Sequence, residues 1–168
     1  MNNSCIKRIN REIDYLQTNK PEYQIYSFTQ NTDKTLTLEI VSPNLNILEF
    51  IIGDDYPFKP PISLKLNGKN YRYLIKHMPA RIEHLYYNPD KMYPAEICYS
   101  FTKPECLCCT GLLCPVNWSP VVTIGHILKE INGHNYLKRH FSYKLLLKEL
   151  FDHRRLPLEL IRSIYQYL

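Results

Sequence analysis

The protein has 168 residues, 45% of them hydrophobic, and can therefore bury one ordinary core with room for a small appendage. No apolar run approaches the roughly 18 residues that a membrane span needs, and the first residues lack the apolar segment of a signal peptide. These features predict a cytoplasmic or nuclear protein with no membrane partner. The formal charge of +5 is spread along the chain instead of forming a basic block, so we expect no nucleic-acid partner either.

The N-terminal half has the pattern of one helix followed by strands. Residues 4–18 carry hydrophobic side chains at helical spacing, with Ser4 at the N-cap position and Lys20-Pro21 as the end of the helix. The hydrophobic positions are Ile6, Ile9, Ile13 and Leu16. Cys5 lies on the same helix and is expected to be a small packing residue. Four strand-like runs follow, at residues 23–30, 36–42, 46–53 and 62–66.

Turn signals separate these strands. The sequence NTDK (31–34) predicts a hairpin between the first two strands, and Asn67-Gly68 predicts a second hairpin turn. The segment YPFKPP (56–61) contains prolines that cannot continue a sheet, because proline has no N–H to donate. We expect an irregular turn there, packed by Tyr56 and Phe58.

The C-terminal half predicts helices on either side of an irregular cysteine region. Residues 71–97 favour short helices broken at Pro79. Ser119-Pro120 is placed to begin a helix over residues 119–131, because proline in the first turn needs no N–H partner, and Asn132-Gly133 is placed to end it. Two further helices are predicted, at residues 136–151 and 156–168.

This order of a helix, an antiparallel meander, an irregular cysteine region and C-terminal helices indicates an α+β fold. We expect one domain over residues 1–151 and a separate C-terminal helix within residues 152–168. The last segment, LPLELIRSIYQYL, resembles the opening of an F-box, a helix that docks onto an adaptor of ligase complexes. The resemblance covers only 13 residues, and we favour the alternative that this helix closes the core.

The stretch from Cys98 to Pro120, CYSFTKPECLCCTGLLCPVNWSP, holds five of the six cysteines and the only tryptophan, Trp118. In a reducing compartment, clustered cysteines indicate metal binding, catalysis or packing before they indicate disulfides.

The order of helix, three-strand meander, YPFKPP, cysteine region, Trp-Ser-Pro and helix resembles the ubiquitin-conjugating enzyme fold. YPFKPP (56–61) is similar to the signature turn of that family, and WSPVVTIGHILKEI (118–131) is similar to the helix after its active site. The resemblance covers roughly residues 4–150. The bias toward Asn, Ile, Lys and Tyr is typical of an AT-rich genome. Such enzymes also occur in large DNA viruses, and a viral protein would act in the host cytoplasm.

The resemblance implies a transferase that needs no cofactor. It would receive ubiquitin, or a ubiquitin-like modifier, from the ubiquitin-activating enzyme as a cysteine thioester and pass it to a substrate lysine with a ubiquitin ligase. In the family, the ligase and the activating enzyme contact the first helix, the proline-rich turn and the Trp-Ser-Pro region. The corresponding partner-binding residues here are Ile6, Phe58, Ser119 and Pro120.

Three cysteines are candidates for the nucleophile, and the sequence leaves the choice open. Cys106 is followed by a leucine, as the family's nucleophile usually is. Cys109 lies nearer to Trp118 and precedes an apolar pair. Cys98 lies downstream of Asn88-Pro89-Asp90, at the place where the family carries His-Pro-Asn.

A zinc site is the competing interpretation of the same cysteines. Cys106 and Cys109 form a C-x-x-C pair, and Cys114 adds a third thiolate ligand. The fourth ligand would come from Cys98, Cys108, His84 or His77. Because a zinc-bound thiolate loses nucleophilicity, this interpretation describes an inactive, conjugating-enzyme-like binding module. The absence of His-Pro-Asn and the surplus of cysteines favour it.

Overall fold

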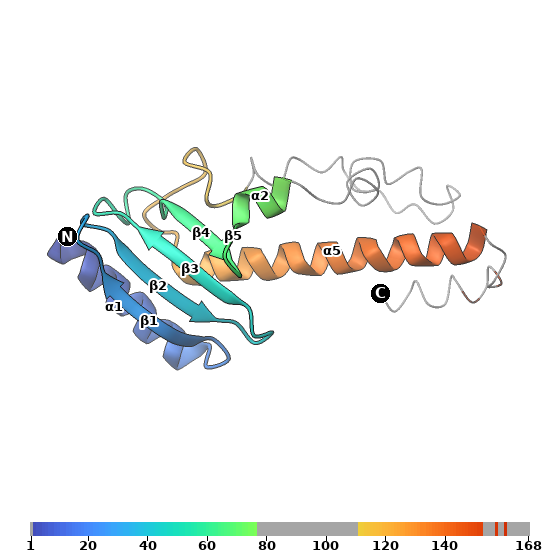
Figure 1. Ribbon diagram of the computed structural model, residues 1–168, viewed down its shortest axis with the longest axis horizontal. Helices are drawn as coiled ribbons and strands as arrows, with labels where there is room; N and C mark the ends of the chain where they lie inside the picture. The colour runs from blue at the N-terminus through green and yellow to red at the C-terminus, as the bar shows by residue number, and fades with distance from the viewer. Residues whose placement is uncertain (1, 77–110, 153–156, 158–159, 161–168) are drawn as a thin grey trace. The chain divides into compact units, whose positions relative to one another are not determined.

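The computed structural model describes residues 2–76, 111–152, 157 and 160. The chain divides into two compact units, residues 1–76 with 107–130, and residues 77–106 with 131–168. The described elements form an α+β fold with an N-terminal helix, a five-stranded antiparallel sheet and a long C-terminal helix (Figure 1). The α+β class, the N-terminal helix and the antiparallel sheet agree with the sequence prediction, whereas the fifth strand and the single long helix were not predicted. The predicted helix at residues 156–168 and most of the segment 71–97 lie outside the described residues.

Helix α1 spans Asn3–Asn19, and Lys20 is its C-cap, immediately before Pro21. The predicted end of the helix at Lys20-Pro21 is confirmed. The predicted N-cap is wrong by two residues, because the side chain of Asn2 accepts the hydrogen bond from the backbone N–H of Ser4. The buried face of the helix consists of Cys5, Ile9, Glu12 and Leu16. The expectation that Cys5 is a packing residue is confirmed, since its side chain is fully buried.

The sheet follows the order β1-β2-β3-β4-β5, and each strand pairs antiparallel with the next. The predicted strands are confirmed to within about two residues. A short fifth strand follows the Asn67-Gly68 turn, where both residues have positive φ, as a two-residue turn of type I′ requires. The strand bounds are Gln24–Gln30, Leu36–Val41, Ile47–Ile52, Ser63–Leu66 and Lys69–Asn70.

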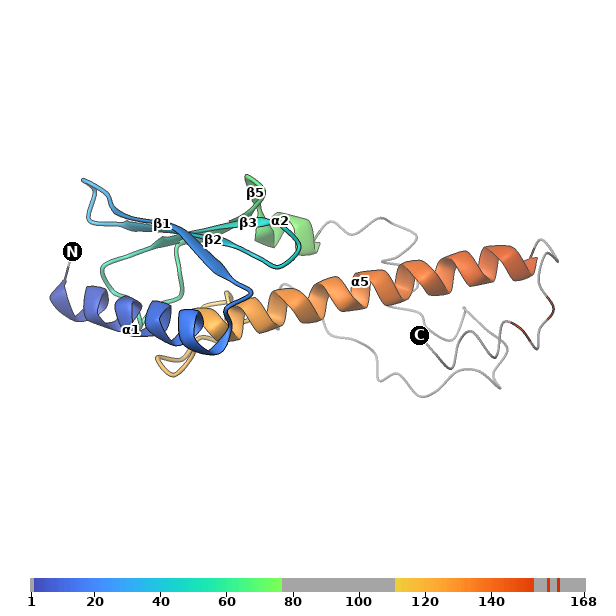
Figure 2. The same ribbon diagram turned by 90° about the horizontal axis from the view of Figure 1, so that it is seen from below.

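The hydrophobic core lies on one face of this sheet. Strand register places Leu38, Phe50 and Leu64 side by side across three strands, and all three are buried. Helix α1 and the first turns of helix α5 (Ile124–Asp152) cover this face (Figure 2). Along β2 and β3, buried side chains alternate with side chains on the other face of the sheet.

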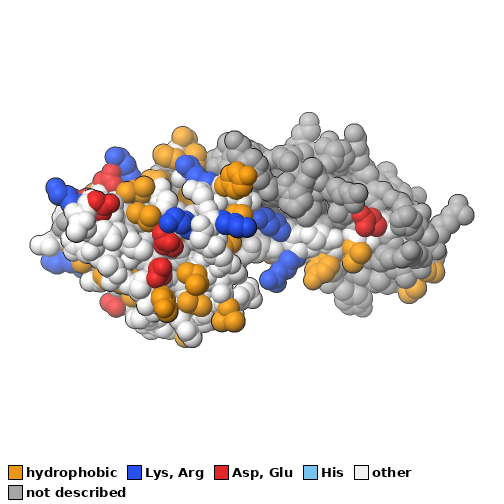
Figure 3. Space-filling model, in the orientation of Figure 1, with side chains coloured by type: hydrophobic (Ala, Val, Ile, Leu, Met, Phe, Trp, Pro, Cys, Tyr) orange, Lys and Arg blue, Asp and Glu red, His pale blue; other side chains and the backbone are white. Residues whose placement is uncertain are grey.

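The opposite face of the sheet, turned toward the viewer in Figure 3, mixes polar, charged and hydrophobic side chains. Ser27, Glu39, Glu49 and Lys65 form one row across four strands. Within this row Ser27 donates to Glu39 at 2.6 Å, and Lys65 pairs with Glu49 at 2.7 Å.

The segment YPFKPP forms an irregular turn, as predicted, with a cis peptide bond between Tyr56 and Pro57. Tyr56 is buried, but the expectation that Phe58 packs inside the turn is wrong, because 77% of its surface is exposed. The backbone N–H of Phe58 bonds to the carbonyl of Asp55, which closes the turn without drawing in the ring.

Two predicted helix boundaries in the C-terminal half are also wrong. Helix α5 begins at Ile124, not at Ser119-Pro120, and it continues through Asn132-Gly133 to Asp152. The predicted helices 119–131 and 136–151 are thus one helix. Before them, the short helix α2 occupies Tyr71–Lys76. Among the described helices, none combines the length and hydropathy needed to cross a membrane.

Candidate functional site

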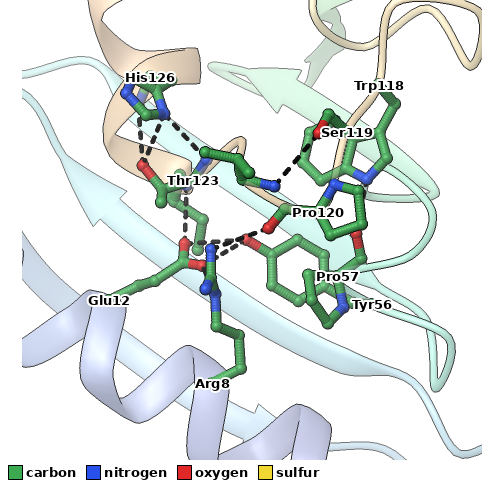
Figure 4. Close-up of polar contacts among 11 residues, drawn as sticks. Arg8, Glu12, Tyr56, Pro57, Trp118, Ser119, Pro120, Thr123 and His126 are labelled. Atoms are coloured by element: carbon green, nitrogen blue, oxygen red, sulfur yellow. Dashed lines mark hydrogen bonds and ion pairs between the residues drawn. The ribbon is translucent and has the colours of Figure 1, made fainter.

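A buried carboxylate, Glu12, joins α1 to the YPFKPP segment (residues 56–61, the proline turn) and to the start of α5 (Figure 4). Its Oε1 accepts a hydrogen bond from Nε of Arg8 at 2.5 Å, and its Oε2 accepts one from the backbone N–H of Ile124 at 2.8 Å. The hydroxyl of Tyr56 lies 2.8 Å from each carboxylate oxygen and donates a hydrogen bond to the pair. Buried charges need such partners, and Glu12 has three.

Two of the side chains that donate to Glu12, those of Arg8 and Tyr56, stay protonated at neutral pH. Burial, followed by the charge and hydrogen bond of Glu12, raises the pKa of Tyr56 well above its usual range, so its hydroxyl remains a donor. Partial burial alone would lower the pKa of Arg8, but its hydrogen bond to Glu12 and the charge of that residue raise it. Arg8 also donates from Nη2 to the carbonyl of Pro120 at 3.2 Å, which ties α1 to the Trp-Ser-Pro segment.

Trp118 connects that segment to the proline turn. Its indole Nε1–H donates to the carbonyl of Pro57 at 2.7 Å, and its ring packs against Tyr56 with the ring centroids 5.9 Å apart (Figure 4). Trp118 is therefore a packing anchor that attaches its segment to the turn. It does not stand at the beginning of a helix, because α5 begins at Ile124.

The segment 111–117 is held in place by two further side chains. The backbone N–H of Leu112 donates to Oε2 of Glu130 at 2.7 Å, and Nη2 of Arg72 donates to the carbonyl of Leu113 at 3.0 Å. Inside the segment, Asn117 donates from its side chain to the carbonyl of Gly111 at 3.3 Å. Helices α2 and α5 and the proline turn therefore fix the residues that follow the cysteine cluster.

Glu130 is one of the residues that line a surface groove of about 550 Å³. Burial raises the pKa of Glu130, although its hydrogen bond from Leu112 acts in the opposite direction. Among the described residues its Oε1 has no hydrogen-bond partner. The groove is lined by Leu112, Val121, Val122, His126, Lys129 and Glu130.

The candidate nucleophiles Cys106, Cys109 and Cys98 lie outside the described residues, so their choice stays a prediction. Cys114 is half-buried as a free thiol, and its backbone N–H bonds to Gly111. Within residues 2–76 and 111–152, no group of three or more histidine, cysteine or acidic side chains could hold a metal ion. The predicted zinc ligands other than Cys114 are not among those residues.

The predicted partner-binding residues lie on segments that contact one another. Phe58, Ser119 and Pro120 are exposed, and Ile6 is half-buried on α1. The hydrogen bonds from Arg8 to Pro120 and from Trp118 to Pro57 bring their three segments together.

Two residues that organise this region were not predicted from the sequence. Glu12 follows Cys5 and Ile9 on the apolar face of α1, and an acidic residue at such a position, four after Arg8, is the signal that indicates a buried ion pair. Glu130 gave no comparable signal, because it lies on a helix rich in charged side chains.

Comparisons of the chain with known protein families, with curated proteins and with solved structures found no match.

Proposed function

We propose that this protein has a ubiquitin-conjugating-enzyme-like fold and carries ubiquitin, or a ubiquitin-like modifier, on a cysteine between Cys98 and Cys109. The observation that supports this best is the contact of Trp118 with the Tyr56-Pro57 turn. These two segments lie 61 residues apart in the sequence. They carry the two motifs that resemble the family, and these motifs follow one another along the chain in the same order as in the family.

The proposed reaction is two successive acyl transfers. The thiolate of the protein attacks the thioester of the activating enzyme, so that a new S–C bond forms and the activating enzyme leaves as its own thiolate. A substrate lysine, as the free amine, then attacks the new thioester. An amide bond forms, the amine loses a proton, and the cysteine is regenerated as a thiolate.

The surface around Phe58, Ser119 and Pro120 would receive the activating enzyme and the ligase. Phe58 supports this role because a large aromatic side chain projects from a turn whose backbone is fixed by Trp118. An exposed aromatic side chain on a fixed stretch of backbone is a suitable anchor for a protein interface.

The experiment mixes the protein with ubiquitin, ubiquitin-activating enzyme and ATP and looks for an adduct that thiol reductants remove. Serine substitutions at Cys98, Cys106, Cys108 and Cys109 identify the nucleophile, because the serine variant at that position retains at most a reductant-resistant ester. An adduct that survives in all four variants, or no adduct at all, contradicts the proposal.

The docking surface is tested in the same reaction. Phe58→Ala should slow adduct formation by at least about tenfold, the effect of losing an interface anchor. Leu45→Ala is the matched control, since Leu45 is also an exposed hydrophobic residue but lies in the loop between β2 and β3. Equal rates for the two variants would argue against a partner surface at the turn.

The second candidate function is a binding module without transferase activity, stabilised by zinc on Cys106, Cys109 and Cys114. The absence of His-Pro-Asn favours it. In that case the purified protein contains one zinc per chain, and chelation unfolds it. A protein that forms no adduct, binds ubiquitin and loses its fold with chelator would support this function.

A further inference from the structure

Strand β1 forms one edge of the sheet, and its outer edge is open among the described elements. Figure 2 looks onto this edge, and no labelled element lies in front of β1. Because an antiparallel strand directs its backbone groups alternately to its two sides, part of the N–H and C=O groups of β1 point away from β2. An edge of this kind is a template for another strand.

The sequence of β1 lacks most of the features that prevent edge pairing. Gln24–Gln30, QIYSFTQ, contains no charged residue and no proline. One protective feature is present, a β-bulge between Ile25 and Ser27. Beyond the bulge, residues 27–30 continue in regular register with β2, so four residues remain available for regular pairing.

Phe28 indicates which kind of strand could pair with the outer edge of β1. It lies on the core face, opposite Leu38, at the end of the row that continues through Phe50 and Leu64. The other three members of this row are buried, whereas 39% of the surface of Phe28 is exposed. The core of the sheet is therefore incompletely covered at this edge.

We propose that β1 pairs antiparallel with β1 of a second copy of this chain, about a two-fold axis that passes beside Phe28. This axis keeps both cores on the same side of the joined sheet, because residues directly opposite one another share a face. The two Phe28 rings then lie opposite each other, and Ser27 faces Thr29 of the second copy.

Charge supports a second copy as the partner. The paired strands are uncharged, so no like charges meet inside the interface. Glu22 lies just before β1, and Lys34 lies in the hairpin turn that follows β1. Antiparallel pairing about Phe28 therefore directs Glu22 of one copy toward the end that carries Lys34 of the other.

Sedimentation of the full chain over a concentration series tests this inference. We expect reversible association to twice the monomer mass, and Phe28→Lys, which sets two cations against each other, should raise the dissociation constant by at least about tenfold. Leu45→Lys, at an exposed residue away from β1, should leave it unchanged. A protein that stays monomeric, or a dimer that Phe28→Lys does not weaken, overturns the proposal.

A cross-linking variant keeps the test decisive if Phe28→Lys fails to fold. Opposite residues in an antiparallel pair have Cα atoms roughly 4.5–5.5 Å apart, within the range of a disulfide. Mild oxidation of Phe28→Cys should give a covalent dimer in which mass spectrometry finds the two introduced cysteines joined to each other. Leu45→Cys should give no such product. If the two variants cross-link equally, or neither does, the proposed pairing is wrong.

Discussion

Glu12 is a charged residue on a helix face that otherwise consists of hydrophobic side chains, and it keeps its place because three donors surround it. Arg8 supplies the opposite charge, Tyr56 a hydroxyl and Ile124 a backbone N–H. These donors come from three separate elements, so one carboxylate determines how α1, the proline turn and α5 meet. A substitution that removes it leaves a buried hydroxyl and a buried N–H without acceptors.

We therefore expect Glu12→Ala to lower the free energy of unfolding by about 3–5 kcal/mol, the usual cost of breaking a buried ion pair. Urea denaturation followed by circular dichroism measures this change. Asp14→Ala, on the exposed side of the same helix, should change the stability by less than about 0.5 kcal/mol. If both substitutions have the same small effect, the Glu12 network does not stabilise the fold.

Glu130 behaves differently, because only one of its carboxylate oxygens has a partner among the described residues. Burial raises the pKa of Glu130, which means that the fold stabilises its charged form less well than water does. Glutamine keeps an acceptor for the N–H of Leu112 and removes the charge. Glu130→Gln should therefore leave the protein equally stable at pH 7 or up to about 1 kcal/mol more stable.

The control for this prediction is Glu130→Leu, which removes the acceptor as well as the charge. It should lower the stability by about 1–3 kcal/mol, because the N–H of Leu112 loses its partner. Thermal unfolding of both variants beside the parent protein provides the comparison. A Glu130→Gln protein as unstable as Glu130→Leu would mean that the charge itself is needed.

At the scale of elements, the strands and the first helix were predictable from the sequence, because alternation and helical spacing are local signals. The ends of α5 were not. Glycine within a helix costs only about 1 kcal/mol, so Gly133 did not end α5 once the neighbouring turns favoured continuation. The beginning of α5 is set by Thr123 and His126, whose backbone N–H groups each bond to the other's side chain. A histidine in place of Glu or Gln hides this capping box from a sequence search.

The candidate site was predictable in part for the same reason. YPFKPP and Trp118-Ser119-Pro120 are local motifs, so the sequence indicated where the proline turn lies and which segment follows the cysteine region. The sequence did not indicate that Trp118 bonds directly to Pro57, since that contact depends on how the chain folds back over many residues. Phe58 was predicted to pack inside because it is aromatic, but it lies on the outer side of the turn.

Trp118 should be the main attachment of its segment to the turn. Trp118→Phe retains a ring against Tyr56 but loses the bond to Pro57, which should lower the free energy of unfolding by about 1 kcal/mol. Trp118→Ala loses both and should lower it by about 2–4 kcal/mol. Val116→Ala, a highly exposed position in the same segment, is expected to have almost no effect. Circular dichroism in urea distinguishes the three variants.

At the scale of the whole molecule, the free energy of unfolding depends on pH in the alkaline range. Among the described residues, three buried acids contribute to this dependence: the thiol of Cys5 and the hydroxyls of Tyr56 and Tyr71. Burial, and then the charges of Asp54 and Asp55, raise the pKa of Cys5 from 9.0 to about 11. Burial also raises the pKa values of Tyr56 and Tyr71, helped by the charges of Glu12 and Glu130 respectively. All three shifts are upward, so their contribution to stability is complete below the unfolded-state pKa values and is lost as the pH rises above them.

The free energy of unfolding should accordingly fall above about pH 9, with a steeper loss above the ordinary tyrosine pKa of about 10. Tyr56→Phe has one ionisable group fewer and should lose stability less steeply over this range. Urea titrations at a series of pH values give the slope directly. Parallel curves for the parent and the variant would show that Tyr56 does not contribute to the pH dependence.

The hydrogen bond from Arg72 to the carbonyl of Leu113 joins two residues that are 41 positions apart. Residues 77–110, which carry Cys98, Cys106, Cys108 and Cys109, lie between these two positions in the sequence. The hydrogen bond therefore attaches both ends of the stretch that carries the candidate nucleophiles to the same place on the fold.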